Sequence, residues 1–342
     1  MQSLRLSLAL ISLLAAFSIS SVALAEVPAE FDGESAIEVE AEPQDWWEPS
    51  YLIDYGVILT GTAGYLIGEN LTPRGQALIG PQYDPDDPLP IFTDPVVGRT
   101  YLDEGTEESV PTRWVEVGVA SSMIFVAALE GANWAVGAGS GLEFHHAVMG
   151  SLETTALTGA ITSLSKPFFG RLRPDFGERA LRYHCPAEAE RFGEVCEGYA
   201  DRPLDEDPDQ ADKLMRDGQK SFISGHSSHG YNLFTYAALV LGGRYVWGRD
   251  ATTTSRVVVI PVQLAMVSAG SYFAFSRLVD GRHYTSDVLV GSAVGLGLAN
   301  LSYWRRFHLD GTPRVRNRSA ANFDLTVAPG PDGAMLQFSM SY

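Results

Sequence analysis

Cysteine and positive charge are both scarce in this chain of 342 residues. There are only two cysteines, Cys185 and Cys196, and 24 lysines and arginines stand against 42 aspartates and glutamates. A formal net charge of −18 argues against partners that are themselves anionic, nucleic acid first among them. We find no internal repeat, and no set of cysteine, histidine and acidic residues has the spacing of a metal site. The sequence therefore predicts neither a nucleic-acid-binding protein nor a metal centre.

Basic residues, although few, recur in three short stretches that also hold histidines. The stretches are Lys166 to Pro174, then Ser224-Gly225-His226, then Ser276-Arg277 with His283 and Asp287 further on. A phosphoryl group in transfer carries negative charge on its equatorial oxygens, so a site without a metal needs several fixed cations and N–H donors. It also needs a nucleophile and a proton donor, which two histidines and an orienting carboxylate can provide. Together the stretches predict a site for a phosphate ester.

The three stretches resemble the signature of the type 2 phosphatidic acid phosphatase and vanadium haloperoxidase superfamily, written K-x6-R-P, P-S-G-H and S-R-x5-H-x3-D. The first and third blocks match at every fixed position. The second differs only at Ile223, where the family usually has proline, and this should loosen a turn without removing a catalytic atom. The resemblance extends over about Trp114 to Trp304. It implies an all-α fold and a phosphohydrolase.

The resemblance also implies a role for each matched residue. His283 would attack phosphorus and carry the phosphoryl group, Asp287 would orient its ring, and His226 would protonate the leaving oxygen and then activate water. The phosphate oxygens would be held by Lys166, Arg173, Ser224, Gly225 and Arg277. The residues alone agree with this division, because the second block precedes a helical run whose N-terminus favours an anion. Likewise, His283 and Asp287 are four apart, a spacing that brings two side chains together on a helix.

Four neighbouring residues have ordinary structural interpretations. Arg171 lies inside the first block, but a cation there could simply end a helix. His229 follows His226 by three residues, which is common at a helix start, and we interpret it as structural. Asp280 and Arg282 adjoin the third block, and we expect both to lie in a solvated loop.

The N-terminus has the pattern of a secretory signal peptide, residues 1–25. A single Arg5 precedes an apolar run, and Ala23-Leu24-Ala25 stands before Glu26. We therefore expect a periplasmic protein, and in that oxidising compartment a disulfide between Cys185 and Cys196, with a pair of free thiols as the alternative. Residues 26–50 are acidic and predict a flexible lead-in.

Six stretches have the length and apolarity of long helices, which predicts a bundle of about six. They are Tyr51–Ile67, Trp114–Val136, His145–Ser165, Ser228–Trp247, Val257–Phe275 and Ser286–Trp304. After a cleaved signal, six membrane spans would leave the three blocks in the cytoplasm. One arrangement that avoids this is a helical domain in the periplasm, soluble or associated with the membrane, and charged residues such as Glu130 inside the stretches favour it. The other is an inner-membrane protein with a periplasmic site, in which the first helix lies outside the bilayer and five span it.

Three further segments complete the organisation around the helical domain, residues 51–318. Residues 175–219 join the first two blocks, contain both cysteines and show no clear helical periodicity, so we predict a lid at the substrate entrance. Asp84–Glu108 is rich in proline and aspartate and indicates a solvated spacer. Residues 319–342 alternate polar and apolar side chains around Pro329-Gly330, which predicts a β-hairpin packed on the helices.

The sequence thus predicts a metal-independent phosphatase for phosphate monoesters that uses no cofactor. Its substrate would be a lipid phosphate, such as phosphatidic acid, or a small soluble phosphate. One alternative is a vanadium-dependent haloperoxidase, since the same cations would bind vanadate. The other is a non-catalytic phosphate or headgroup binder, which would not need two histidines and an aspartate. The leaving alcohol and the oligomeric state cannot be read from the sequence.

Overall fold

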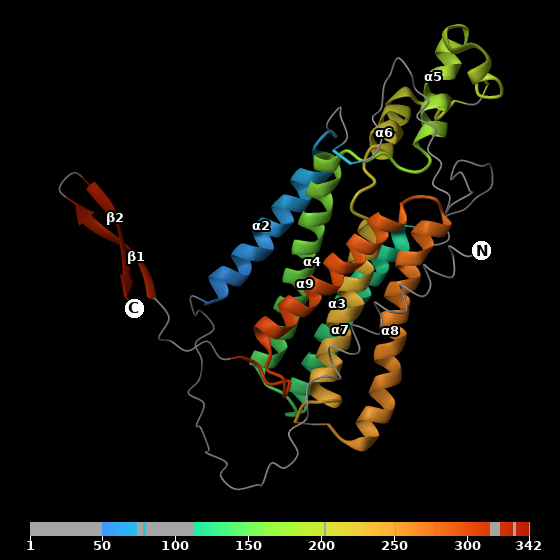
Figure 1. The fold of residues 1–342 in the computed structure, drawn as a ribbon. Coiled ribbons are helices and arrows are strands. Elements are labelled where there is room, and N and C mark those ends of the chain that lie inside the picture. Colours follow the sequence, from blue (N-terminus) through green and yellow to red (C-terminus); the bar gives the residue numbers. More distant parts are fainter. Residues whose placement is uncertain are drawn as a thin grey trace.

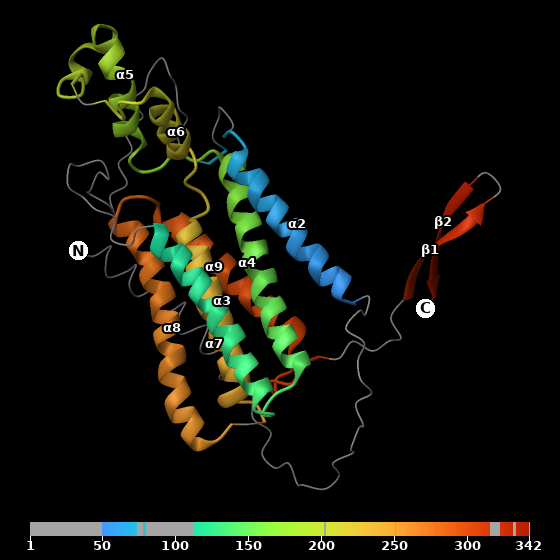
Figure 2. The ribbon, with the colours of Figure 1, turned by 180° about the vertical axis from the view of Figure 1, so that it is seen from behind.

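The computed structural model describes residues 50–73, 78–79, 112–201, 203–249, 251–314, 322–330 and 333–341. Its elements are α2 (Ser50–Asn70), α3 (Thr112–Ala135), α4 (Gly141–Phe169), α5 (Phe176–Phe192), the 3₁₀ helix η1 (Gly193–Cys196), α6 (Pro208–Gly218), α7 (Gly225–Tyr245), α8 (Thr253–Val279), α9 (Thr285–Arg306), β1 (Asn322–Gly330) and β2 (Gly333–Ser341). Six long helices run side by side, and α5 and α6 lie beyond one end of them (Figure 1). Figure 2 shows the same separation from behind. The expected signal peptide, most of the acidic lead-in and the Asp84–Glu108 spacer lie outside the described residues.

All six predicted long helices are confirmed as α2, α3, α4, α7, α8 and α9. Local signals fix where several of them begin and end. At the start of α4, Ser140 and Glu143 form a capping box in which each side chain bonds the other's backbone N–H. The same helix ends at Gly170, whose φ of 59° lies in the left-handed region that glycine favours. Because Lys166 stands in the last turn of α4, this stop places the first block at one end of the bundle.

The bundle core lies between α3, α4, α7 and α9. Its buried members are Val126, Ala147, Tyr236, Ala237, Leu239, Val240, Ala299, Tyr303 and Phe307. Helix α2 packs closely along α4: a Cβ added to Gly68 would come within 2.4 Å of the Ser163 carbonyl carbon. In both views α2 follows α4 along the bundle (Figures 1 and 2). The five-span arrangement, in which the first helix lies outside the bilayer, stays a prediction.

The insertion between the first two blocks, residues 175–219, is more ordered than its sequence suggested. The expectation of a loop without helices was wrong, because the segment contains α5, η1 and α6 around a small core of its own. That core consists of Leu172, Phe176, Ala180, Leu204, Ala211 and Met215. Two hydrogen bonds close the base of the insertion, from Arg173 N–H to Gly218 O at 2.7 Å and from Ser221 N–H to Arg171 O at 2.9 Å. We call this pair of bonds the neck.

The last strands pair with each other in an antiparallel, two-stranded sheet. Asn322 lies opposite Ser341 and Gly330 opposite Gly333. The β-hairpin packed on the helices that the sequence predicts for residues 319–342 stays a prediction.

Candidate active site

The three blocks meet at the end of the bundle that carries α5 and α6, which we call the motif end. The first block occupies the last turn of α4 and the residues after it, and the second begins α7. The third joins the end of α8 to the start of α9. In both views these helix ends lie together beneath the insertion (Figures 1 and 2). The ends of α4 and α8 and the starts of α7 and α9 thus bring residues more than 100 positions apart into one region.

His283 and Asp287 form the centre of this region. His283 Nδ1 lies 3.7 Å from Asp287 Oδ2, and both side chains are almost fully buried. Three other groups hold the carboxylate: Ser221 Oγ donates to Oδ2 at 2.5 Å, the Tyr284 N–H donates to Oδ2 at 3.1 Å, and Arg171 Nη1 donates to Oδ1 at 2.6 Å. An aspartate fixed in this way can set the orientation of the imidazole beside it.

Burial lowers the pKa of His283 to about 4, although the neighbouring Asp287 opposes this shift; the nearby Arg173 cation adds to the lowering. The ring is therefore neutral around pH 7. A neutral imidazole has a free lone pair, which is what a nucleophilic nitrogen requires.

His226 is the second residue of α7, directly after the helix start formed by Ser224 and Gly225. Its Nε2 is buried and has no hydrogen-bond partner among the described residues. The His283 ring and the charges of Arg277, Lys166 and Arg173 all act on it electrostatically. Since buried polar atoms are normally paired, an orphaned ring nitrogen among cations indicates a place for a ligand atom.

Each predicted phosphate-binding cation is held by a carboxylate. Arg277 Nη2 donates to Asp280 Oδ2 at 2.7 Å, Arg173 Nη2 donates to Asp217 Oδ1 at 2.9 Å, and Lys166 Nζ lies 3.9 Å from Glu69 Oε1. The Lys166 ammonium also faces the second block, since a Cβ added to Gly225 would lie 3.8 Å from Nζ. These contacts hold the cations around His283 and His226, with Arg173 and Arg277 in a buried, weakly screened setting and Lys166 in a partly exposed one.

The turn that carries Ser224 is held from two sides. Ser224 is fully buried, its N–H donates to the Asp287 carbonyl oxygen at 3.3 Å, and its hydroxyl accepts from Ser227 Oγ at 2.9 Å. At the position where the family has proline, the Ile223 N–H donates to Ser165 Oγ at 3.3 Å. Proline could not make this bond, so isoleucine anchors the turn that we expected it to loosen.

Among the neighbouring residues, Arg171 contacts the site, and Asp280 and Arg282 depart from expectation. Arg171 does more than end a helix, because it pairs with Asp287 and its guanidinium lies 4.2 Å from the centre of the Tyr284 ring. The solvated loop expected for Asp280 and Arg282 is wrong, since their side chains are 5% and 14% exposed. His229 is partly buried on α7, and its structural interpretation stays a prediction. In the part of the chain that the structure describes, no three histidine, cysteine or acidic side chains gather as they do around a metal ion.

Sequence reasoning missed Ser221, Glu69 and Asp217. Ser221 stands only three residues before Ser224, so its nearness to the second block was a usable signal. Glu69 lies in the last turn of α2, and Asp217 lies in the last turn of α6. No motif includes them, and only the packing of α2 and of the insertion brings them to the cations.

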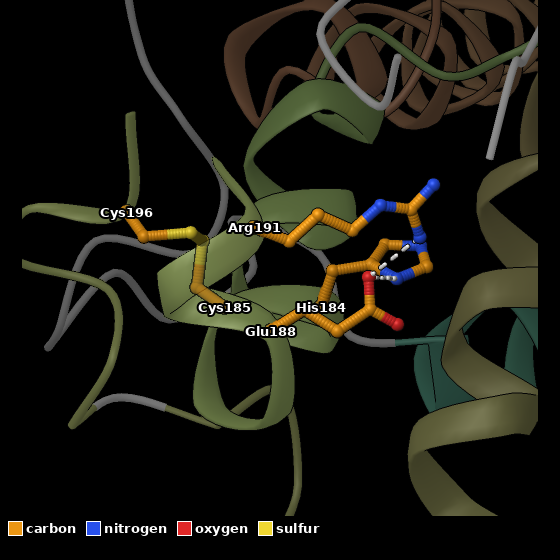
Figure 3. The surroundings of a disulfide bond; sticks show 5 residues. All are labelled: His184, Cys185, Glu188, Arg191 and Cys196. Carbon is orange, nitrogen blue, oxygen red and sulfur yellow. Dashed lines mark hydrogen bonds and ion pairs between the residues drawn. A yellow bond between two sulfur atoms is a disulfide. The ribbon is translucent and has the colours of Figure 1, made fainter. Parts of the chain in front are cut away.

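The predicted disulfide is confirmed. Cys185 and Cys196 are joined, with their Cα atoms 5.3 Å apart, and both are buried. Figure 3 shows the bond beside Glu188, whose carboxylate lies 3.2 Å from Arg191 Nη1 and 3.8 Å from His184 Nδ1. The bond ties α5 to η1 at the tip of the insertion, away from the three blocks.

Comparison with known proteins agrees with the three blocks. Residues 147–309 match the PAP2 superfamily. A probable diacylglycerol pyrophosphate phosphatase 1 of Schizosaccharomyces pombe is 30% identical over 200 residues, covering 58% of this chain and 66% of that protein. Lipid phosphate phosphatase 2 of Arabidopsis thaliana is 30% identical over 172 residues, covering 48% of this chain and 52% of the relative. Human phospholipid phosphatase 2 is 30% identical over 151 residues, covering 43% and 46%.

The chain spans between about half and two thirds of the length of these relatives. No solved structure matches it. The matched residues contain all three blocks and the helices that bring them together. The PAP2 superfamily match therefore covers the part of the chain that holds the three blocks, in agreement with the type 2 phosphatidic acid phosphatase superfamily that its motifs resemble.

Proposed function

We propose that this protein hydrolyses lipid phosphate monoesters through a phosphohistidine formed on His283. The observation that carries the proposal is the buried His283–Asp287 pair, set among cations and accompanied by a second histidine whose Nε2 lacks a partner in the described residues. Binding alone would require the cations but not two histidines and an oriented carboxylate.

The proposed reaction has two steps. In the first, His283 Nε2 attacks phosphorus, the bond from phosphorus to the alcohol oxygen breaks, and His226, which must be protonated for this step, gives that oxygen a proton. In the second, His226 takes a proton from water, whose oxygen attacks phosphorus and releases inorganic phosphate from His283. Asp287 stabilises the positive charge on the phosphorylated ring, while Lys166, Arg173 and Arg277 stabilise the charge on the phosphoryl oxygens. All these cations are side chains, so we expect full activity in chelator.

The outer surface of the helices supports a lipid substrate. Large apolar side chains are exposed on several of the long helices, including Leu59 on α2, Ile124 on α3, Val257 on α8 and Leu301 on α9, each at least 64% exposed. Among the described residues, two helices are long and apolar enough to cross a bilayer, Glu116–Ala135 and Thr253–Val279. A soluble domain would cover such a surface. The relatives above are named as phosphatases of phospholipids and lipid phosphates. We therefore propose that the bundle is embedded in a membrane.

Arginines suggest how the bundle is oriented. Arg244, Arg249, Arg256 and Arg305 lie at or beyond the ends of α7, α8 and α9 that are remote from the three blocks. Positive charge gathers on the cytoplasmic side of membrane proteins, so the motif end would face the periplasm. The start of α2 would then be cytoplasmic. On this proposal the signal peptide expected from the sequence would stay uncleaved, because cleavage would leave the acidic segment before α2 outside. Mass spectrometry of the purified protein distinguishes an N-terminal segment that is retained from one that has been cleaved.

The catalytic proposal is tested by phosphate release from phosphatidic acid in mixed detergent micelles, with a soluble chromogenic phosphate as the comparison. His283→Ala and His226→Ala should each lower kcat by at least about 10³-fold. The matched control is His308→Ala, since His308 is exposed and follows α9 at the end away from the blocks. Retained turnover by His283→Ala would reject the phosphohistidine. Preference for the soluble phosphate would reject the lipid substrate.

Carbonate washing of membranes tests the embedding. An integral protein stays in the pellet, whereas full release would favour the soluble periplasmic domain.

A further inference from the structure

Arg173, the last cation of the first block, directs two of its donor nitrogens at Asp217 and leaves the third without a bond to a described residue. Its Nε donates to the Asp217 backbone oxygen at 3.0 Å, and its Nη2 donates to Asp217 Oδ1 at 2.9 Å. Its Nη1 makes no hydrogen bond with any described residue, although the side chain is only 10% exposed. Because a guanidinium is planar and rigid, fixing one edge also fixes where the remaining donors point.

Asp217 is itself held in place by α5. Arg179 is buried and donates twice to Asp175 Oδ2, at 2.9 and 2.8 Å, while its Nη1 donates to the Leu214 carbonyl oxygen on α6 at 3.0 Å. The same Nη1 lies 3.7 Å from Asp217 Oδ2. The end of α6 also meets α5 directly, because a Cβ added to Gly218 would lie 2.8 Å from the Phe176 ring. The insertion is thus braced internally up to the residue that touches Arg173.

We propose, on the basis of the phosphatase function above, that Asp217 is a positioning residue that aims Arg173 at the substrate phosphate. The segment 175–219 then has a second task besides bordering the entrance. Its two helices form a brace that carries the Asp217 carboxylate to the back of a phosphate-binding guanidinium.

A carboxylate beside a phosphate-binding arginine could instead occupy the place of the phosphate and leave when substrate arrives. The contacts favour positioning. Two of the bonds that join α6 to Arg173 use backbone oxygens, those of Asp217 and Gly218, and these cannot withdraw unless the last turn of α6 unfolds. The charge of the Asp217 carboxylate also suits a residue that positions a guanidinium. Burial raises the pKa of Asp217, but Arg173, Arg179 and Arg282 outweigh this and lower its pKa well below the usual value. It stays ionised over the pH range of an assay.

The test compares Asp217→Asn with Asp209→Asn, the same substitution at an exposed position on the same helix. The asparagine keeps the size and one acceptor but removes the charge that holds the guanidinium. We expect Asp217→Asn to raise the inhibition constant of inorganic phosphate and the KM for phosphatidic acid by roughly tenfold, the weight of a charge-assisted hydrogen bond. Its thermal unfolding should match that of the control, and Asp217→Glu should recover part of the loss.

Two outcomes would overturn the proposal. One is an inhibition constant for phosphate equal to that of Asp209→Asn, and the other is tighter phosphate binding, which would show that Asp217 competes with the anion. If Asp217→Asn does not fold, the same comparison is made with Asp217→Glu, whose longer side chain should displace Arg173 and still raise the KM. Titration of inorganic phosphate by calorimetry gives a readout without turnover. An inactive wild-type enzyme would therefore count against the proposed function and leave Asp217 open to test.

Discussion

The two ends of the bundle contain the same kinds of residue and use them differently. At the end away from the blocks, every guanidinium nitrogen of Arg306 is engaged: Nε and Nη2 donate to Glu153, and Nη1 donates to Asp54. Arg244 is engaged in the same way by Glu130, Glu143 and the Ala138 carbonyl oxygen. At the motif end, Arg173 keeps Nη1 unused among the described residues, and His226 keeps Nε2 unused.

Burial and charge therefore do not distinguish a binding site from a structural network in this protein. Both ends bury arginines beside carboxylates, and Arg306 is more deeply buried than Arg173. What differs between Arg306 and Arg173 is whether a donor nitrogen remains after the hydrogen bonds to described residues have been counted. A fully paired network holds helices together, whereas a partly paired one has capacity for a ligand.

Among the tests of the difference between the two ends, Arg244→Gln should have the largest effect on stability. This change leaves Glu130 and Glu143 buried without their shared guanidinium, and losing one partner of a buried ion pair costs about 3–5 kcal/mol. We expect that loss in the free energy of unfolding in detergent, with KM unchanged for the protein that remains folded. Arg249→Gln is the control, because Arg249 also contacts Glu143 but is 52% exposed, and such pairs contribute little. A rise in KM for Arg244→Gln would remove the distinction between the two ends.

Arg173→Gln should show the opposite pattern. Removing one donor to the transferring phosphoryl group costs about 10²–10³-fold in rate. We expect that loss in kcat/KM for phosphatidic acid, with a much smaller change in unfolding than for Arg244→Gln. Arg173→Lys should recover only part of the activity, since lysine keeps the charge but not the planar donor geometry. Equal destabilisation by Arg173→Gln and Arg244→Gln would show that both arginines are structural.

Removing the disulfide should have the smallest effect on activity, because the bond lies at the tip of the insertion. A bond that closes a loop with a sequence separation of 11 contributes up to about 3 kcal/mol through the unfolded state. The double change Cys185→Ser and Cys196→Ser should therefore make the insertion more sensitive to limited proteolysis and leave phosphate release from the soluble substrate unchanged. Activity lost together with the disulfide would mean that the tip of the insertion, as well as the end of α6, supports the site.

How far the sequence predicted this molecule depended on how local the signals were. Six helices were found because each is long and apolar, and the three blocks because their residues are chemically distinctive. Helix α6 was overlooked although Asp207 and Pro208 are good residues for a helix start, since the helix has only 11 residues and is largely polar. Glu69 and Asp217 could not have been found, because their role depends on where α2 and α6 pack. Asp280 was misplaced for a related reason: adjacency to a loop does not reveal that its carboxylate turns inward to Arg277.

The neck has a consequence for how such an enzyme can diversify. Its two backbone bonds join Arg171 to Ser221 and Arg173 to Gly218. The chain therefore leaves the bundle and returns to it at one fixed place. The residues between these two bonds can be lengthened, shortened or exchanged while the neck keeps its geometry. The insertion could therefore acquire a new substrate preference while the catalytic residues stay the same, provided that α6 still places the Asp217 carboxylate beside Arg173.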